Sequence, residues 1–375
     1  MAKEAPTVID LFSGCGGASL GFLLQGFRLA AAIDNDKAAC ETYKTNLGLE
    51  PLLGDVGSTS AKEILDSAGL RPREPTVVIG CPPCQGFTKL RKKKFDKRNR
   101  LIYKYVDLVK ELKPEFVLFE NVPGILRVAR GTYFEWVCNS LYDLGYGYVT
   151  SVLDAVNYGV PQFRKRVIVL ATRLRPCFPF LRLPLWTHSS PAESKRLRVN
   201  PWVTVRDAIG DMPPLEAGQN NVSLPNSETG THGSLVLKRI RDIPKNGGSR
   251  SDMRKRLWLD CHDPSKTDVG FLDVYGRLRW NRPAGTITSG CTNPTKGRFI
   301  HPTQDRALTA REAARLQSFP DRLRPLDWYK EDFVFKGNRA EVSTQIGNAL
   351  PPRTAGELAN TILEIASRSA HLPHG

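Results

Sequence analysis

The chain has 375 residues, a formal net charge of +16, 41% hydrophobic residues and 25% charged residues. This composition excludes wholesale disorder, and the length predicts one large domain joined to a smaller one. No apolar run reaches the roughly 18 residues that cross a bilayer, and the first residues lack a signal-peptide layout. The eight cysteines are too sparse for a disulfide framework. We therefore expect a cytoplasmic protein with reduced thiols.

The positive charge is concentrated in two segments. Residues 89–100 carry eight basic residues and one acid, a net charge of +7, and residues 175–306 carry a net charge of +9. The remainder of the chain is neutral. A neutral body with two basic segments indicates a localised surface for a polyanion, although a basic run can also be a solvated loop.

The first 175 residues alternate between short apolar runs and amphipathic stretches. We expect strands at 8–12, 28–34, 77–80, 116–120, 146–155 and 166–171, and helices at 17–26, 36–46, 60–68, 101–112 and 132–144. This alternation predicts an α/β fold with a doubly wound, mostly parallel sheet, in which ligands bind beyond the carboxyl ends of the strands.

The pattern changes after about residue 175, where Pro, Gly, Ser and Asn become frequent. We expect short strands at 202–205, 270–274 and 285–289 in a second, irregular domain. Helices are expected at 309–317, where Thr309 and Glu312 have the spacing of a capping box, and at 353–367.

A glycine-rich turn, DLFSGCGG (10–17), follows the first expected strand. Such a turn presents backbone N–H groups to a ligand, and Asp34 at the end of the second strand is placed to hold ribose hydroxyls. Asp55 follows a third expected strand and is a candidate for an adenine amino group. This pattern favours an adenosine-containing cofactor without choosing between NAD and S-adenosylmethionine.

The segment GCPPCQGF (80–87) stands at another strand end. Three interpretations compete for its two cysteines: half of a zinc site, a thioredoxin-like redox pair, or a single nucleophilic thiolate held rigidly by the prolines. No second cysteine pair has zinc spacing, and a redox pair should open a helix after an early strand of a small domain. The nucleophile is the favoured interpretation.

Two further segments combine polar residues with strand ends. Glu120 opens ENVPG (120–124), and its alternative role is a favourable charge at the start of the next helix. In GVPQFRKRV (159–167), Gln162, Arg164 and Arg166 alternate, so they point to one face of an extended segment. The alternative there is an exposed strand edge guarded by charges.

Together, DLFSGCGG (10–17), PPCQGF (82–87), ENVPG (120–124), QFRKR (162–166) and QIGNALPP (345–352) resemble the motifs of the cytosine-C5 DNA methyltransferases. The resemblance covers nearly the whole chain. It implies a Rossmann-like S-adenosyl-L-methionine-dependent catalytic domain over 1–175 and a target-recognition domain over 176–305. It also implies a C-terminal segment over 306–375 whose helix returns to the catalytic domain.

The resemblance assigns the reaction to a cytosine flipped out of duplex DNA. Cys84, rather than Cys81, matches the nucleophile that attacks C6. Glu120 would contact N3 and the exocyclic amine, Arg166 would bind O2, and Arg164 would position the catalytic loop or its phosphates. The catalytic set implied by the motifs is Cys84, Glu120, Asn121, Gln162, Arg164 and Arg166.

The same resemblance implies a cofactor pocket and no metal. Some members of the family have a stacking aromatic just after the ribose acid, whereas this chain has Asn35, so adenine stacking should rest mainly on Phe12. The pocket is expected to comprise Phe12, Gly14, Cys15, Gly16, Asp34, Asn35, Asp55, Val56, Pro83, Leu101, Asn348 and Ala349.

Residues 89–100 resemble the mobile catalytic loop of the family, with basic side chains on phosphates. Base readout by arginine, asparagine or glutamine is expected from the second domain, although most basic residues there should contact phosphates. The expected DNA-binding residues are Gln85, Phe87, Arg91, Lys92, Lys93, Arg98, Arg239, Arg241, Arg254, Arg277, Arg279, Thr286 and Thr288.

The leading hypothesis is a site-specific DNA cytosine-C5 methyltransferase, monomeric and nucleoid-associated, that either protects DNA beside a cognate restriction endonuclease or acts as an orphan without one. Three alternatives stay open at this stage. They are a methyltransferase acting on tRNA, a catalytically silent DNA-binding module, and a nicotinamide oxidoreductase.

Overall fold

The computed structural model describes residues 5–83, 99–260, 263, 265, 273–321 and 332–370, and the chain divides into two compact units. Unit 1 comprises Met1–Tyr158, Lys165–Thr187 and Leu350–Gly375, and unit 2 comprises Gly159–Arg164 and His188–Ala349. This division differs from the expected boundaries, because residues 306–349 join unit 2 and only the last 26 residues return to unit 1. The expected boundary at 305 was therefore misplaced.

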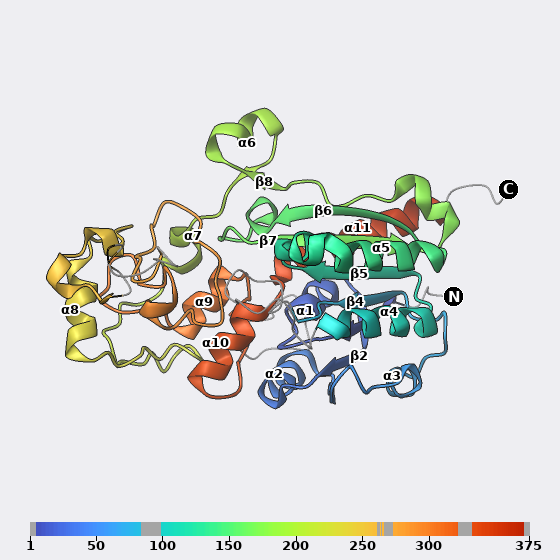
Figure 1. The fold of residues 1–375 in the computed structure, drawn as a ribbon, viewed down its shortest axis with the longest axis horizontal. Helices are drawn as coiled ribbons and strands as arrows, with labels where there is room; N and C mark the ends of the chain where they lie inside the picture. The colour runs from blue at the N-terminus through green and yellow to red at the C-terminus, as the bar shows by residue number, and fades with distance from the viewer. Residues whose placement is uncertain are drawn as a thin grey trace. The chain divides into compact units, whose positions relative to one another are not determined.

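Unit 1 is built on a seven-stranded sheet with the order β3-β2-β1-β4-β5-β7-β6 (Figure 1). Strands β1 to β5 pair in parallel, whereas β7 pairs antiparallel with both β5 and β6. The predicted α/β class and mostly parallel sheet are confirmed. The strands are β1 (Thr7–Leu11), β2 (Arg28–Asp34), β3 (Leu52–Leu53), β4 (Val77–Gly80), β5 (Phe116–Asn121), β6 (Gly147–Asp154) and β7 (Lys165–Thr172).

Helices cover both faces of this sheet. Helices α1 and α11 pack against the face that carries Val8, Ile79 and Leu118, and α3, α4 and α5 pack against the opposite face. At the crossing of α1 and α11, a Cβ on Gly21 would lie 2.5 Å from the Pro352 carbonyl oxygen, so the close approach requires glycine. The helices of unit 1 are α1 (Gly17–Leu23), α2 (Lys37–Leu47), α3 (Ala61–Ala68), α4 (Arg100–Leu112), α5 (Thr132–Asp143) and α11 (Pro352–Ala370).

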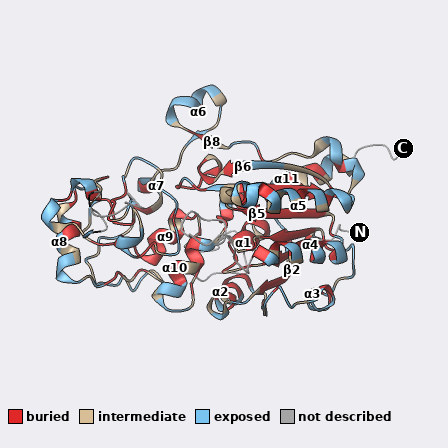
Figure 2. Ribbon diagram, viewed as in Figure 1, coloured by how far each residue is buried: buried red, intermediate tan, exposed pale blue. Residues whose placement is uncertain are grey.

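Burial follows the alternation that the sequence shows. The central strands of the sheet are buried, α1 is almost entirely buried, and α3, α4 and α5 have one buried and one exposed face (Figure 2). This two-sided cover explains why β1, β4 and β5 are mostly apolar. None of the described helices combines the length and the apolar character needed to cross a bilayer.

Unit 2 is irregular, as expected, but the short strands expected at 202–205 and 285–289 do not form. Thr204 instead caps a helix, because its side chain accepts the Asp207 N–H in a capping box, and 285–289 is a loop. Most of 270–274 lies outside the described residues. The elements of unit 2 are β8 (His188–Ser189), β9 (Asn200–Pro201), α6 (Pro191–Leu197), α7 (Val205–Ile209), α8 (Ser234–Asp242), α9 (Ala310–Leu316) and α10 (Arg339–Asn348).

Helix α9 anchors unit 2. The predicted capping box is confirmed, because Thr309 and Glu312 satisfy each other's backbone N–H groups at its start. The Glu312 carboxylate also pairs with Arg306 at 2.7 Å, and both side chains are almost fully buried. Helix α9 contacts α7 and α10, which explains why residues 306–349 belong to unit 2.

Candidate active site

The polar residues of unit 1 gather at the carboxyl ends of neighbouring strands. Strands β1, β4 and β5 run side by side in parallel, with Leu11 opposite Gly80 and Gly80 opposite Phe119. The glycine-rich turn, Cys81 and Glu120 therefore follow adjacent strand ends. The sequence pattern predicted this edge as the ligand-binding edge.

Glu120 and Arg166 contact each other at this edge. Arg166 Nε lies 2.7 Å from Glu120 Oε1, with side-chain exposures of 13% and 11%. Arg166 reaches Glu120 because β7 returns antiparallel beside β5, with Val167 opposite Asn121. Partial burial of this charge pair limits screening by water, so each group holds the other in place.

Cys81 also contacts Glu120, and it is held as a thiol. Burial raises its pKa well above the usual range, and the negative charges of Glu120 and Asp10 raise it further against the opposing effect of Arg166. A thiol held in the protonated form is a poor nucleophile. This disfavours Cys81 as the reacting cysteine, in agreement with the choice of Cys84.

Cys84 itself lies outside the described residues, as do Gln85, Phe87, Arg91, Lys92, Lys93 and Arg98. The backbone leading to Cys84 is described as far as Pro83, which is half-buried. Asn121 is fully buried and donates through Nδ2 to the Pro82 carbonyl oxygen at 3.2 Å. Asn121, predicted as catalytic, thus holds the backbone of the segment that leads to Cys84.

The glycine-rich turn after β1 is hydrogen-bonded to the carboxylate of Asp34 at the end of β2. The Gly14 N–H donates to Asp34 Oδ2 at 2.7 Å, and Asp34 Oδ1 accepts the Asp36 N–H at 2.9 Å. Phe12, half-buried, adopts φ 80°, a conformation that is uncommon for a residue with a side chain and often marks a functional turn. A Cβ on Gly14 would meet no atom within 4 Å, so open space lies over the turn.

These features fit the adenosine part of S-adenosylmethionine. The turn offers backbone donors and room, Asp34 offers carboxylate oxygens for ribose hydroxyls, and Phe12 offers a partly exposed ring. Cys15 adds only its backbone, since its side chain is 2% exposed and burial raises the pKa of the thiol to about 12. Gly16 begins α1, where a Cβ would clash with Leu47.

The remaining expected pocket residues fall into three groups. Asn35 and Asp55 are exposed, and Asp55 Oδ1 accepts the Gly57 N–H at 2.8 Å beside Leu101. Val56 is buried in the core and can offer only its backbone. Asn348 and Ala349 end α10 and belong to unit 2.

Comparison with known proteins identifies the family. The model of the C-5 cytosine-specific DNA methylases matches residues 6–364. The chain belongs to this family. It is 32% identical to the type II methylase M.HgiDII of Herpetosiphon aurantiacus, over 95% of this chain and 94% of that protein.

Two further likenesses agree. The methylase is 34% identical to the type II methyltransferase M1.HphI of Haemophilus parahaemolyticus, covering 96% of this chain and 87% of that protein. A solved structure described as a prophage-encoded DNA modification methyltransferase from E. coli shares 26% identity, with a TM-score of 0.65 over 97% of this chain and 100% of that one. The protein is a DNA cytosine-5 methyltransferase.

Within the methylase, the alternating residues 162, 164 and 166 divide between the two units. Arg164 is 1% exposed, and its two Nη atoms donate to the carbonyl oxygens of Ile287, Gly347 and Ala349, all within unit 2. Most of the catalytic loop that Arg164 is expected to position lies outside the described residues, so this role stays a prediction. The chain passes from unit 2 to unit 1 after residue 164.

Gln162 is likewise held within unit 2. It is fully buried, donates to the Leu316 carbonyl oxygen at 2.9 Å and accepts the Ile287 N–H at 2.9 Å. Gln162 also donates to Gln317 at 2.7 Å. These bonds join the Gly159–Arg164 segment to the body of unit 2, and the catalytic role of Gln162 stays a prediction.

Two arginines expected to bind DNA are instead internal. Arg277 is 0% exposed, donates to four backbone carbonyls and pairs with Asp305 at 2.5 Å. Arg239 is 8% exposed and donates to the Leu257 carbonyl oxygen at 2.8 Å. The expectation that these two bind DNA is wrong, because sequence cannot distinguish a buried arginine from a surface one.

The other expected residues of unit 2 are exposed. Arg241, Arg279 and Thr288 are open to solvent, Arg254 pairs with Asp242 at 2.5 Å, and Thr286 donates to the Phe163 carbonyl oxygen at 2.8 Å. Exposure leaves them able to contact DNA.

Asp10 is a buried acid of β1 that the sequence interpretation did not single out. It is 1% exposed, accepts the Ser19 hydroxyl at 2.6 Å through Oδ2, and its Oδ1 has no hydrogen-bond partner among the described residues. Burial raises its pKa to about 7. The available signal was an acid inside the apolar run VIDL, on the face that alternation assigns to Val8 and to helix α1.

Proposed function

We propose that this methylase flips a cytosine out of duplex DNA and methylates C5 from S-adenosyl-L-methionine, with Cys84 as the nucleophile. Unit 1 is the catalytic domain in this proposal, and unit 2 supplies target recognition. The observation that carries the proposal is the Glu120–Arg166 pair, which lies at the carboxyl edge of the sheet beside the Pro82–Pro83 segment.

The pair suits the polar edge of a cytosine. N3 and the exocyclic O2, which is bonded to the neighbouring C2, lie on one edge of the cytosine, so two side chains 2.7 Å apart can contact both of them. A proton shared between the Glu120 carboxyl and N3 makes the ring electron-poor and C6 susceptible to the thiolate of Cys84. Attack at C6 makes C5 nucleophilic; after methylation a base takes the C5 proton, and the C6–S bond breaks to release Cys84.

The cofactor supplies an electrophilic methyl group when it is bound. Asp34 would hold the ribose, Phe12 would pack against the adenine, and the Gly14 backbone would approach the ligand closely. Asn35, Asp55, Val56, Pro83 and Leu101 would complete the part of the pocket that unit 1 provides, with Asn348 and Ala349 as further candidates from unit 2.

The partner is double-stranded DNA. The basic segment 89–100 directly follows the nucleophile, and exposed Arg241, Arg254, Arg279 and Thr288 on unit 2 are available to it. The relatives are type II methyltransferases, which supports a role beside a restriction endonuclease. The proposed state is a monomer in the cytoplasm.

The decisive experiment follows tritium from labelled cofactor into duplex DNA and traps the covalent adduct with a 5-fluorocytosine duplex. Wild-type protein should label duplex DNA and leave bulk tRNA unlabelled. Cys84→Ser should abolish both labelling and adduct, while Cys81→Ser should retain the adduct. Full activity of Cys84→Ser, or preferential labelling of tRNA, would refute the proposal. Bisulfite sequencing of DNA from expressing cells then gives the target site.

A further inference from the structure

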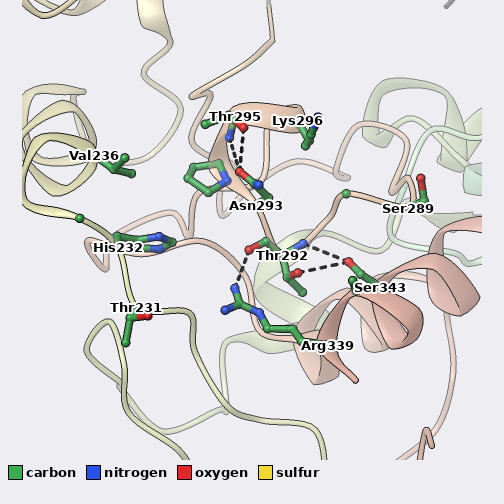
Figure 3. A pocket seen from close by; sticks show the side chains of 14 residues that line it. Thr231, His232, Val236, Ser289, Thr292, Asn293, Thr295, Lys296, Arg339 and Ser343 are labelled. Carbon is green, nitrogen blue, oxygen red and sulfur yellow. Dashed lines mark hydrogen bonds between the residues drawn. The ribbon is translucent and has the colours of Figure 1, made fainter. Parts of the chain in front are cut away.

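Unit 2 contains a pocket of about 550 Å³ that the mechanism above does not use (Figure 3). Three segments line it: residues 231–236 at the start of α8, residues 289–296, and residues 339–343 at the start of α10. Its volume is in the range of sites that hold a small ligand or one unit of a polymer.

The pocket is positively charged. Lys296 and Arg339 line it, and none of the described residues that line it is acidic. Within the described part of the chain, neither cation forms an ion pair with a carboxylate. Both charges are therefore available to an anionic ligand.

Arg339 is held in a defined position. Its Nη2 donates to the Thr292 carbonyl oxygen at 2.7 Å, and a Cβ on Gly230 would lie 2.1 Å from Nη1. Burial lowers the pKa of Arg339, and Glu228 partly opposes that effect. A half-buried guanidinium with fixed geometry is preorganised for an anion.

Two neutral polar groups of the pocket, on His232 and Asn293, have N–H donors that their hydrogen bonds to the described residues do not use. His232 Nε2 accepts the Ala307 N–H at 3.3 Å, so in the neutral ring the proton resides on Nδ1. Burial and Arg339 lower the pKa of His232, which keeps the ring neutral at pH 7. Asn293 Oδ1 accepts from the backbone and hydroxyl of Thr295, and its NH2 group is not used in that turn.

Apolar surface adjoins these donors. Val236 and Pro294 line the pocket together with the His232 ring. Cations and N–H donors beside a flat or apolar wall match a phosphate joined to a sugar and a base.

We propose that this pocket binds one nucleotide of the substrate DNA other than the target cytosine, with its phosphate against Lys296 and Arg339. The base or sugar of that nucleotide contacts Val236 and Pro294. This proposal rests on the proposed function, since it takes duplex DNA as the substrate. A free nucleotide shares the same chemistry and is distinguished by the experiment.

The test measures the affinity of the full chain for a fluorescent duplex across a salt series. Each lost phosphate contact lowers the slope of log K against log salt by about 0.9. Lys296→Gln should lower the slope by about that amount and weaken binding about 3- to 10-fold. Arg339→Gln should behave likewise, while Arg339→Lys keeps most of the slope. The control Lys62→Gln, on an exposed position of α3, should leave both quantities unchanged.

The inference would be overturned if the slope of log K against log salt for both Lys296→Gln and Arg339→Gln equalled that of the wild type. If Arg339→Gln does not fold, Asn293→Asp takes its place, because it keeps the oxygen that caps the turn and adds a repulsive charge. A second outcome would overturn it in favour of a free nucleotide. In that outcome, Lys296→Gln loses binding of deoxycytidine or deoxyadenosine monophosphate but keeps the wild-type salt slope for the duplex. The tritium assay on the wild type is independent, so a failure of the proposed function is recognised separately.

Discussion

Arg166 Nε lies 2.7 Å from Glu120 Oε1, and the two residues come from strands that run in opposite directions. The antiparallel insertion of β7 between β5 and β6 creates this contact, because it brings the start of β7 beside the end of β5. The methylase thus has a charge pair in place before any base arrives. In the proposed reaction, both groups exchange part of this contact for contacts with the cytosine.

Arg166→Ala should lower kcat for methyl transfer about 100- to 1000-fold, the usual cost of removing one preorganised charged donor from an active site. Glu120 would then lack its partner in a poorly hydrated place. Arg166→Lys should recover part of the rate, because it restores charge without the planar fork. Single-turnover tritium transfer measures this, with circular dichroism as the folding control. An unchanged kcat in Arg166→Ala would show that the pair is not part of the reaction.

Asp34→Ala should weaken S-adenosylmethionine binding at least tenfold, since it removes hydrogen bonds to a charged group that are worth about 1.5–3 kcal/mol each. The same change releases the Gly14 N–H that Asp34 accepts at 2.7 Å. Asp36→Asn is the matched control, because asparagine still caps α2. Isothermal titration with the cofactor decides the matter, and equal affinities of the two variants would contradict the assignment.

Arg277→Ala should destabilise unit 2 by about 3–5 kcal/mol, because it leaves four buried carbonyls and Asp305 without their donor. Arg279→Ala, two residues away and exposed, should leave the urea midpoint unchanged and weaken only DNA binding. Urea denaturation followed by tryptophan fluorescence separates the two. Equal urea midpoints for Arg277→Ala and the wild type would mean that Arg277 does not stabilise unit 2.

Asp10→Asn should become more stable relative to wild type as the pH rises. The pKa of Asp10 is about 7 in the folded protein and 3.8 in the reference state, so the folded protein binds a proton that the unfolded chain has released between these values. The wild-type contribution therefore falls as pH rises through that window, by about 1.4 kcal/mol per unit. Between pH 5 and pH 8 the two proteins should diverge by about 2–3 kcal/mol in urea unfolding. Parallel curves would refute a buried neutral carboxyl.

Local structure in unit 1 was largely predictable from sequence. The expected strands at 28–34 and 77–80 match β2 and β4, because both are continuous apolar runs buried on two faces. The capping box at Thr309 was also predictable, since it depends on two residues three positions apart. The expected strands at 202–205 and 285–289 did not form, because a β-branched run without a pairing partner has no ladder to join.

The positions of the predicted catalytic side chains were only partly predictable from the sequence. Alternation placed Gln162, Arg164 and Arg166 on one face, yet the chain changes unit between Arg164 and Lys165. Alternation of side chains every two residues describes the local geometry of an extended segment. It does not show which of the two units each side chain packs in. Arg277 and Arg239 were misassigned for a similar reason, because their partners are backbone carbonyls that only the fold assembles.

The sequence by itself determined the family, the class of fold and the order of the strand ends that carry polar residues, because these depend on local motifs and periodicity. Only the tertiary structure decided that Arg166 pairs with Glu120, that Cys81 is held as a thiol and that Arg164 and Arg277 are internal. These outcomes depend on burial and on which residues, distant in the sequence, come into contact. The free energy of an ionised side chain is set by its burial and by the groups close to it in space, rather than by the residues beside it in the chain.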